Sequence, residues 1–142
     1  KEIFKLIDDM EETLYSIDIG IGLAAPQIGV HKRVILITLF QKVKGEKEPR
    51  EKLLVLINPV IVSYSMETVM MEEGCLSLPD YYAEVERPEK TVVEFLDQKG
   101  KKQKLALDGL HAREVQHEID HLDGVLFSDK VLKKKVKGQL YL

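Results

Sequence analysis

The most informative segment of the sequence is "QHEIDHLDG" (Gln116–Gly124), which holds two histidines four residues apart and a glutamate directly after the first. It closes a longer helical pattern in which Asp108 can act as the N-cap and Gly124 as the residue that follows the C-cap. Positions i and i+4 of a helix project from the same face. The stretch therefore predicts a helix of about thirteen residues that presents His117 and His121 side by side.

Upstream of this helix, the chain predicts a second helix and a series of strands. Residues 1–18 carry apolar side chains at three- and four-residue spacing, which indicates a helix with one buried stripe: Ile3, Leu6, Ile7, Met10, Leu14 and Ile17. The glycine-rich segment 19–29 cannot continue that helix. Strands are expected in three segments: 33–40; 53–62, bent at Asn58-Pro59; and 66–79, where a strand leads into a turn.

A hairpin is expected at 91–107, because "DQKGK" places Gly100 where a positive φ is needed. The charged segment 41–52 is expected to be a solvated loop. Strands that follow one another in sequence, rather than alternating with helices, favour antiparallel pairing. The expected fold is therefore α+β, a single domain over 1–142, with mainly antiparallel sheets packed around a central metal-binding helix and with an N-terminal helix.

The composition is that of an ordinary globular protein, with 44% apolar and 32% charged residues. A formal charge of −3 leaves no footprint for DNA or a membrane, and no apolar run has the length of a membrane span or the form of a signal peptide. The single cysteine, Cys75, excludes a disulfide within the chain and fits a reducing compartment. The lysine-rich tail from residue 130 is expected to be a solvated face, with weak polyanion contact as the alternative.

The helix carries the candidate chemistry. The side-chain roots of His117 and His121 should lie about 6 Å apart, which lets both rings reach one metal ion at about 2.0–2.1 Å. Glu118 is rotated by about 100° from His117, so it can flank the metal and accept a proton from an attacking water. The alternative is a surface helix with two incidental histidines, but the face through these residues is mostly polar. We favour the metal site.

A catalytic metal usually has three protein ligands, so a third must come from elsewhere in the chain. Cys75 is the candidate, because its thiolate would be stabilised by the metal, although a lone cysteine is more often a small buried hydrophobe. His31 and His111 are expected to be surface histidines: His31 follows a glycine-rich turn, and His111 lies on another face of the helix. Spacing alone does not bring Cys75 to His117.

Three segments together resemble the motifs of the peptide deformylases: "GIGLAAPQ" (Gly20–Gln27), "EGCLS" (Glu73–Ser77) and "QHEIDH" (Gln116–His121). The resemblance extends over nearly the whole chain. It implies a metal-dependent hydrolase that removes the N-formyl group from the initiator formyl-methionine of nascent polypeptides and releases formate. It also implies a further N-terminal segment with an edge strand, which this sequence lacks.

The resemblance assigns roles residue by residue. The ligands of one divalent metal ion would be Cys75, His117 and His121. The general acid/base would be Glu118, and the donors to the developing oxyanion would be the Gln27 side chain and the Leu76 backbone. The substrate chain would pair as an added strand with the backbones of Gly22 and Gly74. The pocket for the methionine side chain would be lined by Ile21, Met71 and Leu110.

Cofactor, partners and location follow from the same resemblance. Ferrous iron is expected as the native metal, with zinc, nickel or cobalt as alternatives. The expected partners are N-formyl-methionyl peptides and, transiently, the ribosome near its exit tunnel, in the bacterial cytoplasm or in an organellar matrix or stroma. A zinc endopeptidase of the His-Glu-x-x-His kind and a binding module with a structural metal remain as alternatives. The first lacks a downstream third ligand, and the second lacks a fourth.

Three residues near the motifs carry expectations of their own. Arg87 is expected to pair with Glu73. Glu114 stands where deformylases usually carry an apolar residue of the side-chain pocket, and an unpaired carboxylate there would be costly. We expect it to rim the pocket, turning to solvent or pairing with Arg113 or a lysine, and the alternative is that the pocket itself differs in this protein. Met70 is expected to fill the core.

Overall fold

The computed structural model describes residues 2–16, 21–75, 78–125, 135–136 and 139–140, with the backbone alone at residues 75, 78–81 and the last two pairs. Its helices are α1 (Glu2–Tyr15), the short 3-10 helix η1 (Ala25–Ile28) and α2 (Gly109–Leu122). Its strands are β1 (Gly22–Ala24), β2 (Val34–Gln41), β3 (Arg50–Tyr64), β4 (Thr68–Cys75), β5 (Leu78–Pro88), β6 (Lys90–Leu96), β7 (Lys102–Asp108), β8 (Lys135–Val136) and β9 (Gln139–Leu140). No helix in this part of the chain is both long and apolar enough to cross a membrane.

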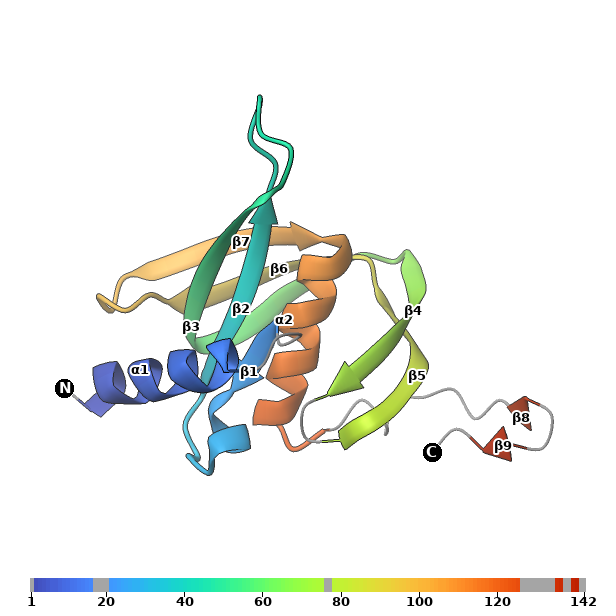
Figure 1. The fold of residues 1–142 in the computed structure, drawn as a ribbon, viewed down its shortest axis with the longest axis horizontal. Helices are drawn as coiled ribbons and strands as arrows, with labels where there is room; N and C mark the ends of the chain where they lie inside the picture. Colours follow the sequence, from blue (N-terminus) through green and yellow to red (C-terminus); the bar gives the residue numbers. More distant parts are fainter. Residues whose placement is uncertain (1, 17–20, 76–77, 126–134, 137–138, 141–142) are drawn as a thin grey trace.

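Two separate sheets build the body of the molecule (Figure 1). The larger sheet has the strand order β1-β2-β3-β6-β7, and every neighbouring pair in it is antiparallel. Strands β4 and β5 form an antiparallel hairpin of their own, and β8 pairs with β9. The expected α+β class with antiparallel sheets is confirmed.

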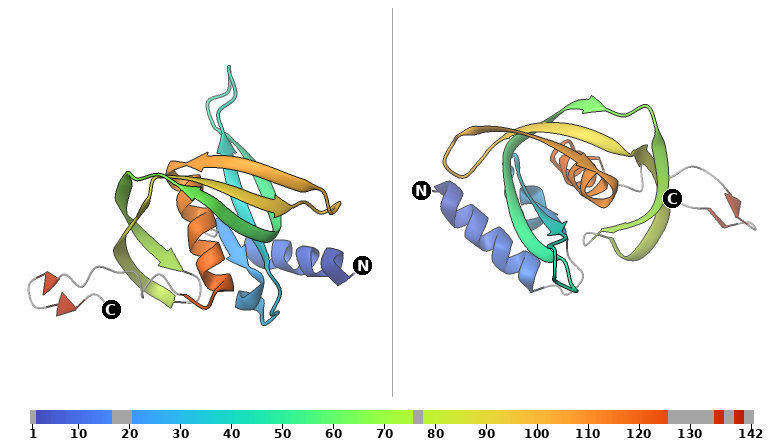
Figure 2. Two further views of the ribbon diagram at one scale, coloured as in Figure 1. Left: turned by 180° about the vertical axis from the view of Figure 1, so that it is seen from behind. Right: turned by 90° about the horizontal axis from the view of Figure 1, so that it is seen from above.

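Strand β2 is buried on both of its faces, which explains its continuous apolar sequence. Val34 and Leu36 belong to the core cluster that also holds the buried stripe of α1. Ile35 and Ile37, which point the other way, belong to the cluster that holds Ala112, Val115 and Ile119 of α2. The larger sheet therefore separates α1 from α2, and Figure 2 shows α2 between that sheet and the β4–β5 hairpin.

The predicted bend and turn occur where the sequence places them. Asn58 has a φ of +51°, and the pairing of β3 with β6 shifts register between Ile57 and Val60. Proline cannot donate to a sheet, so a bulge is its natural place in a strand. Gly100 has a φ of +78° in the turn between β6 and β7, as expected for a residue without a Cβ.

Helix α2 ends in a Schellman motif at the predicted glycine. Gly124 has a φ of +76°, and its N–H donates to the His121 carbonyl at 3.2 Å. The N–H of Val125 donates to the Asp120 carbonyl at 2.8 Å, which completes the motif. At the other end, Asp108 occupies the predicted N-cap position, but its side chain makes no capping hydrogen bond.

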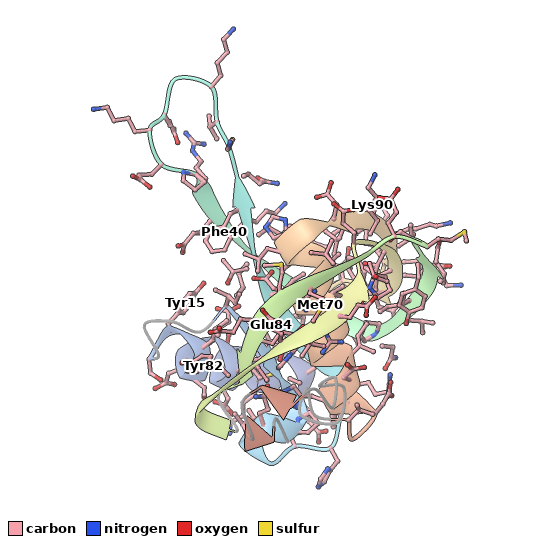
Figure 3. The ribbon with its side chains drawn as sticks, turned by 90° about the vertical axis from the view of Figure 1, so that its right-hand side faces the viewer. Tyr15, Phe40, Met70, Tyr82, Glu84 and Lys90 are labelled. Carbon is pink, nitrogen blue, oxygen red and sulfur yellow. The ribbon has the colours of Figure 1, made fainter. Side chains whose placement is uncertain are left out.

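Strand β5 was not anticipated, and it changes the interpretation of its partner β4. Its outward residues Tyr82 and Glu84 alternate with inward Ala83 and Val85. Figure 3 shows the outer face of this hairpin, on which Met70, Tyr82 and Glu84 are labelled. Met70 is 42% exposed. The expectation that Met70 fills the core was wrong, because the strand period turns this position away from α2.

Candidate metal-dependent active site

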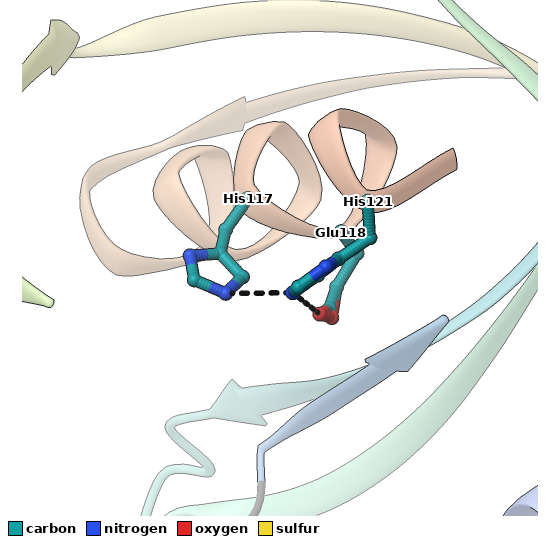
Figure 4. Close-up of side chains that lie close together, drawn as sticks. All are labelled: His117, Glu118 and His121. Carbon is teal, nitrogen blue, oxygen red and sulfur yellow. Dashed lines mark hydrogen bonds and ion pairs between the residues drawn. The ribbon is translucent and has the colours of Figure 1, made fainter. Parts of the chain in front are cut away.

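His117 and His121 project from one face of α2 and meet at their tips (Figure 4). Their Nε2 atoms lie 3.2 Å apart, and their rings meet edge to face with centroids 4.9 Å apart. The Glu118 Oε1 atom lies 3.9 Å from the Nε2 of His121. One ligand atom from each of the three residues falls within 4.8 Å of the others. The prediction that His117 and His121 project side by side from the helix is confirmed, and Glu118 flanks them.

This arrangement fits a metal ion. Two nitrogens that bind one tetrahedral ion at about 2.0–2.1 Å lie roughly 3.3 Å apart, close to the 3.2 Å between the Nε2 atoms of His117 and His121. Two neutral imidazole lone pairs this close would repel each other unless a cation or a proton lay between them. The two imidazole nitrogens, with the Glu118 carboxylate beside them, are therefore suited to a divalent cation.

Glu73, on β4, fixes the orientation of the His117 ring. Its Oε1 atom lies 2.9 Å from the Nδ1 of His117. Burial raises the pKa of Glu73, but hydrogen bonds from His117 and Arg87 outweigh it and lower the pKa to about 2. Because the Glu73 carboxylate is ionised, it can only accept, so His117 carries its proton on Nδ1 and turns the Nε2 lone pair toward His121.

Arg87, on β5, holds Glu73 in place as the sequence predicted. Its Nε donates to Glu73 Oε2 at 2.5 Å and its Nη2 to Glu73 Oε1 at 2.9 Å. The remaining Nη1 donates to Asp120 Oδ2 on α2 at 2.7 Å. Only 2% of the Arg87 side chain is exposed, and such a two-point pair orients a carboxylate more strictly than a single bond.

Arg113 is a second buried arginine that contacts Glu73, and the sequence patterns did not predict this contact. Its Nη1 donates to Glu73 Oε2 and, at 3.0 Å, to the Val85 carbonyl. The available signal was its position one turn before His117, on a polar side of the helix. The buried cluster therefore joins α2 to both strands of the β4–β5 hairpin.

Gln27 is oriented so that its amide nitrogen remains the donor. Its Oε1 atom accepts the backbone N–H of Ala24 at 2.7 Å. Gly22, on the edge strand β1, lies against the base candidate: a Cβ built on it would stand 3.1 Å from Glu118 Cγ. Ile21, just before β1, is half-buried, and its carbonyl accepts the N–H of Thr38 at 2.9 Å. The segment Gly20–Gln27 is therefore far from Gln116–His121 in sequence but adjacent to it in the fold.

Some of the remaining predicted site residues lie in the described part of the chain and others do not. Gly74 lies in β4, under the ring of Tyr82, and Cys75 ends that strand. The side chain of Cys75 and all of Leu76 lie outside the described residues, so their predicted roles stay predictions. Among the pocket candidates, Met71 is 37% exposed and Leu110 is 41% exposed.

Glu114 departs from the expectation that it turns to solvent or pairs with a cation. It is 5% exposed, and neither carboxyl oxygen has a hydrogen-bond partner in the part of the chain that the structure describes. Arg113 is engaged by Glu73 instead. Burial, together with the charge of Glu118, raises the pKa of Glu114 to about 9. The expectation failed because Glu114 shares the inward face with Glu118, one turn away.

The two other histidines, His31 and His111, differ in burial. His31 is exposed, as expected. His111 is half-buried, contrary to expectation: its Nε2 accepts the backbone N–H of Phe40 at 3.0 Å, and its ring stacks on Phe40 with centroids 6.2 Å apart. His111 therefore ties the start of α2 to the end of β2.

Comparison with known proteins identifies the family. Residues 1–137 match the family model described as polypeptide deformylase. The chain belongs to this family. As a deformylase it is a hydrolase that removes an N-formyl group, and the alternative of a zinc endopeptidase is not favoured. The family is metal-dependent, which agrees with the histidine and glutamate group on α2.

The deformylase relatives are similar along most of the chain. The peptide deformylase of Rhizobium meliloti (strain 1021) is 53% identical over 134 residues, which make up 94% of this chain and 74% of that relative. Two solved structures are also similar. The actinonin complex of the Synechococcus elongatus enzyme has a TM-score of 0.82 at 46% identity, over 94% of this chain and 70% of that one. The Met-Ala-Ser-bound class I type b enzyme of Acinetobacter baumannii has a TM-score of 0.83 at 37% identity, over 92% and 82%.

Proposed function

We propose that this deformylase acts through one divalent metal ion held by Cys75, His117 and His121, with Glu118 as its general acid/base. The observation that carries the proposal is the 3.2 Å approach of the two Nε2 atoms beside the buried Glu118 carboxylate. The ionised Glu73 beside His117 supports it, because such a partner fixes the imidazole tautomer that a metal requires.

Native ferrous iron is the proposed metal, with zinc, nickel and cobalt as substitutes. Imidazole and thiolate ligands suit several of these ions, so ligand type alone does not choose among them. When bound, the ion polarises the formyl carbonyl and makes water a stronger acid. Anaerobic purification followed by metal analysis, with activity measured on the same sample, tests the identity.

The protein groups divide the reaction between them. Glu118 takes the proton of the attacking water and then delivers it to the departing nitrogen. The Gln27 amide and the Leu76 backbone N–H donate to the oxygen on which charge develops. Each such donor can be worth about 2.7–4 kcal/mol of transition-state stabilisation. The orientation of Gln27 by the Ala24 N–H supports its part.

We propose that the substrate chain adds as a strand beside Gly22 and Gly74. Both glycines lie in strands at the edge of their sheets, where backbone groups are available for such pairing. Ile21, Met71 and Leu110 would then receive the methionine side chain. The partial exposure of Met71 and Leu110 supports their access to a substrate.

The proposed substrates are the formyl-methionyl ends of nascent chains, close to the ribosome, in the bacterial cytoplasm or in an organellar matrix or stroma. The lysine-rich tail is the candidate ribosome-facing surface. The single cysteine supports a reducing compartment. We further propose that residues 1–142 act as one catalytic domain.

Formate release from formyl-Met-Ala by the metal-loaded protein tests the function. Glu118→Gln should abolish release while the protein keeps its metal, and the exposed Glu84→Gln should leave both unchanged. Formate release by Glu118→Gln at the wild-type rate would refute the assignment of the base. Cleavage of internal peptide bonds without formate release would instead indicate a protease.

A further inference from the structure

The β4–β5 hairpin is not part of the larger sheet. No strand of the five-stranded sheet pairs with it in the described residues, so no sheet hydrogen bonds set its distance from α2. Yet Glu73, which orients His117, lies on this hairpin. One end of the hairpin is tied to the larger sheet, because β4 follows β3 and β5 leads directly into β6. Away from that end, side chains that cross between the hairpin and α2 hold the two together.

Arg113 is placed to do this. It lies on α2, is 6% exposed, and donates to acceptors on both strands of the hairpin. Its Nη1 reaches Glu73 Oε2 on β4 and the Val85 carbonyl on β5, the latter at 3.0 Å. Its Nη2 reaches the Val69 carbonyl on β4 at 2.5 Å. One planar guanidinium thus holds one carboxylate and two backbone carbonyls at once.

Arg87 does not duplicate this role. It stands on β5 and pairs with Glu73 on the adjacent strand, so that contact lies within the hairpin. Its contact with α2 goes to Asp120, one turn beyond His117 near the helix C-terminus. Arg113 stands on α2 four residues before His117, and it contacts Glu73 directly. Gln116 adds a contact from α2 to the end of β5, through the Pro88 carbonyl at 3.0 Å.

We propose that Arg113 is a positioning residue that docks the β4–β5 hairpin onto α2, holds Glu73 against His117 and thereby sets the affinity of the site for its metal. The proposal rests on the proposed metal site. A lysine cannot replace this geometry, because an ammonium group is a compact point charge and lacks the rigid fork of the guanidinium. The fork is what allows three acceptors on two strands to be held by one side chain.

The test compares Arg113→Met and Arg113→Lys with the wild type and with Arg50→Met. Arg50 pairs with Glu46 in the β2–β3 connection and is exposed, so it serves as the matched arginine control. The affinity for Zn²⁺ is measured by competition with a chromophoric chelator, and the coordination by the absorption spectrum of bound Co²⁺. Amide hydrogen exchange of β4 and β5 reports the docking, and circular dichroism reports folding.

Loss of an outer partner of a ligating histidine typically weakens metal binding 10–100-fold. We expect a loss of about this size for Arg113→Met, a smaller loss for Arg113→Lys, and none for Arg50→Met. Faster exchange should appear in β4 and β5. Wild-type zinc affinity, cobalt spectrum and hairpin exchange in folded Arg113→Met would overturn the proposal. If the Met variant does not fold, the same wild-type result in Arg113→Lys would overturn it.

The proposed function is tested separately. Wild-type protein that binds zinc but releases no formate from formyl-Met-Ala would refute the deformylase activity and leave the role of Arg113 standing. Formate release by the wild type together with unchanged metal affinity in the Arg113 variants would support the deformylase activity and refute the role of Arg113.

Discussion

The carboxylate of Glu73 accepts the Nδ1–H of His117 at 2.9 Å, across a separation of 44 residues in sequence. This bond joins the second motif to the third and sets the direction of the Nε2 lone pair that faces His121. The same carboxylate receives the guanidinium groups of Arg87 and Arg113. The buried Glu73 carboxylate therefore links the β4–β5 hairpin to α2 and orients the His117 ring.

Replacing Glu73 by Gln should weaken both metal binding and the fold. An amide cannot balance two buried guanidinium groups, and breaking a buried ion pair typically costs about 3–5 kcal/mol. The amide oxygen can still accept the His117 Nδ1–H, but without the negative charge, so Zn²⁺ binding should weaken by up to about 10–100-fold. Chelator competition and urea unfolding measure the two effects. Glu84→Gln, on the exposed face of the same hairpin, is the control, and equal behaviour of the two variants would contradict the prediction.

Gly22→Ala should slow the reaction without removing the metal. The added Cβ would stand 3.1 Å from Cγ and 3.3 Å from Oε2 of Glu118, so the carboxylate must shift by a few tenths of an ångström. A 1 Å misplacement can cost about 100-fold, so a smaller shift should lower kcat by roughly tenfold. Formate release and zinc affinity are measured together. Unchanged kcat would show that Glu118 tolerates the shift. Loss of the metal would show that the substitution disturbs the metal site and not only the Glu118 carboxylate.

Gly74→Ala should disturb the end of β4, and removal of Tyr82 should relieve the effect. A Cβ at Gly74 would lie 2.5 Å from Cε1 of the Tyr82 ring. Half of Tyr82 is exposed, so its ring can turn toward solvent to make room for the Cβ. We expect Gly74→Ala to weaken zinc binding in the wild type and to have much less effect in Tyr82→Ala. Additive effects in this double-mutant cycle would argue against a direct clash.

Glu114 should make the stability of the metal-free protein fall as the pH rises. Its folded pKa of about 9 lies above the ordinary value of 4.5. Below pH 4.5 both states are protonated, and between the two values folding must take up a proton. The free energy of unfolding should therefore decrease between these pH values, by at most about 1.4 kcal/mol per unit.

Glu114→Leu should remove this pH dependence, so its stability advantage over the wild type should grow from pH 5 to pH 9. Urea unfolding in the presence of a chelator measures it at each pH, with Glu84→Gln as the control. An advantage that is constant with pH, or that shrinks as the pH rises, would mean that Glu114 is ionised in the folded protein.

Local features of the fold were predictable because they depend on neighbours in sequence. The helical period puts His117, Glu118 and His121 together, and the turn at Gly100 and the bend at Asn58 follow from backbone preferences. The strand β5 was missed, since its inward face carries the charged Arg87, which breaks the apolar alternation that predicts a strand.

The amino-acid sequence was therefore enough to predict the helix face that carries His117 and His121, the antiparallel class and, through the joint occurrence of three motifs, the deformylase family. Three features became visible in the folded chain alone: the hydrogen bond from Arg113 to Glu73, the close approach of Gly22 to Glu118, and the burial of the Glu114 carboxylate without a hydrogen-bond partner in the described residues. Sequence patterns miss them because periodicity and turn preference act over a few residues. Burial and ion pairing depend instead on which distant segments come into contact in the folded chain, and a local sequence pattern does not predict those contacts.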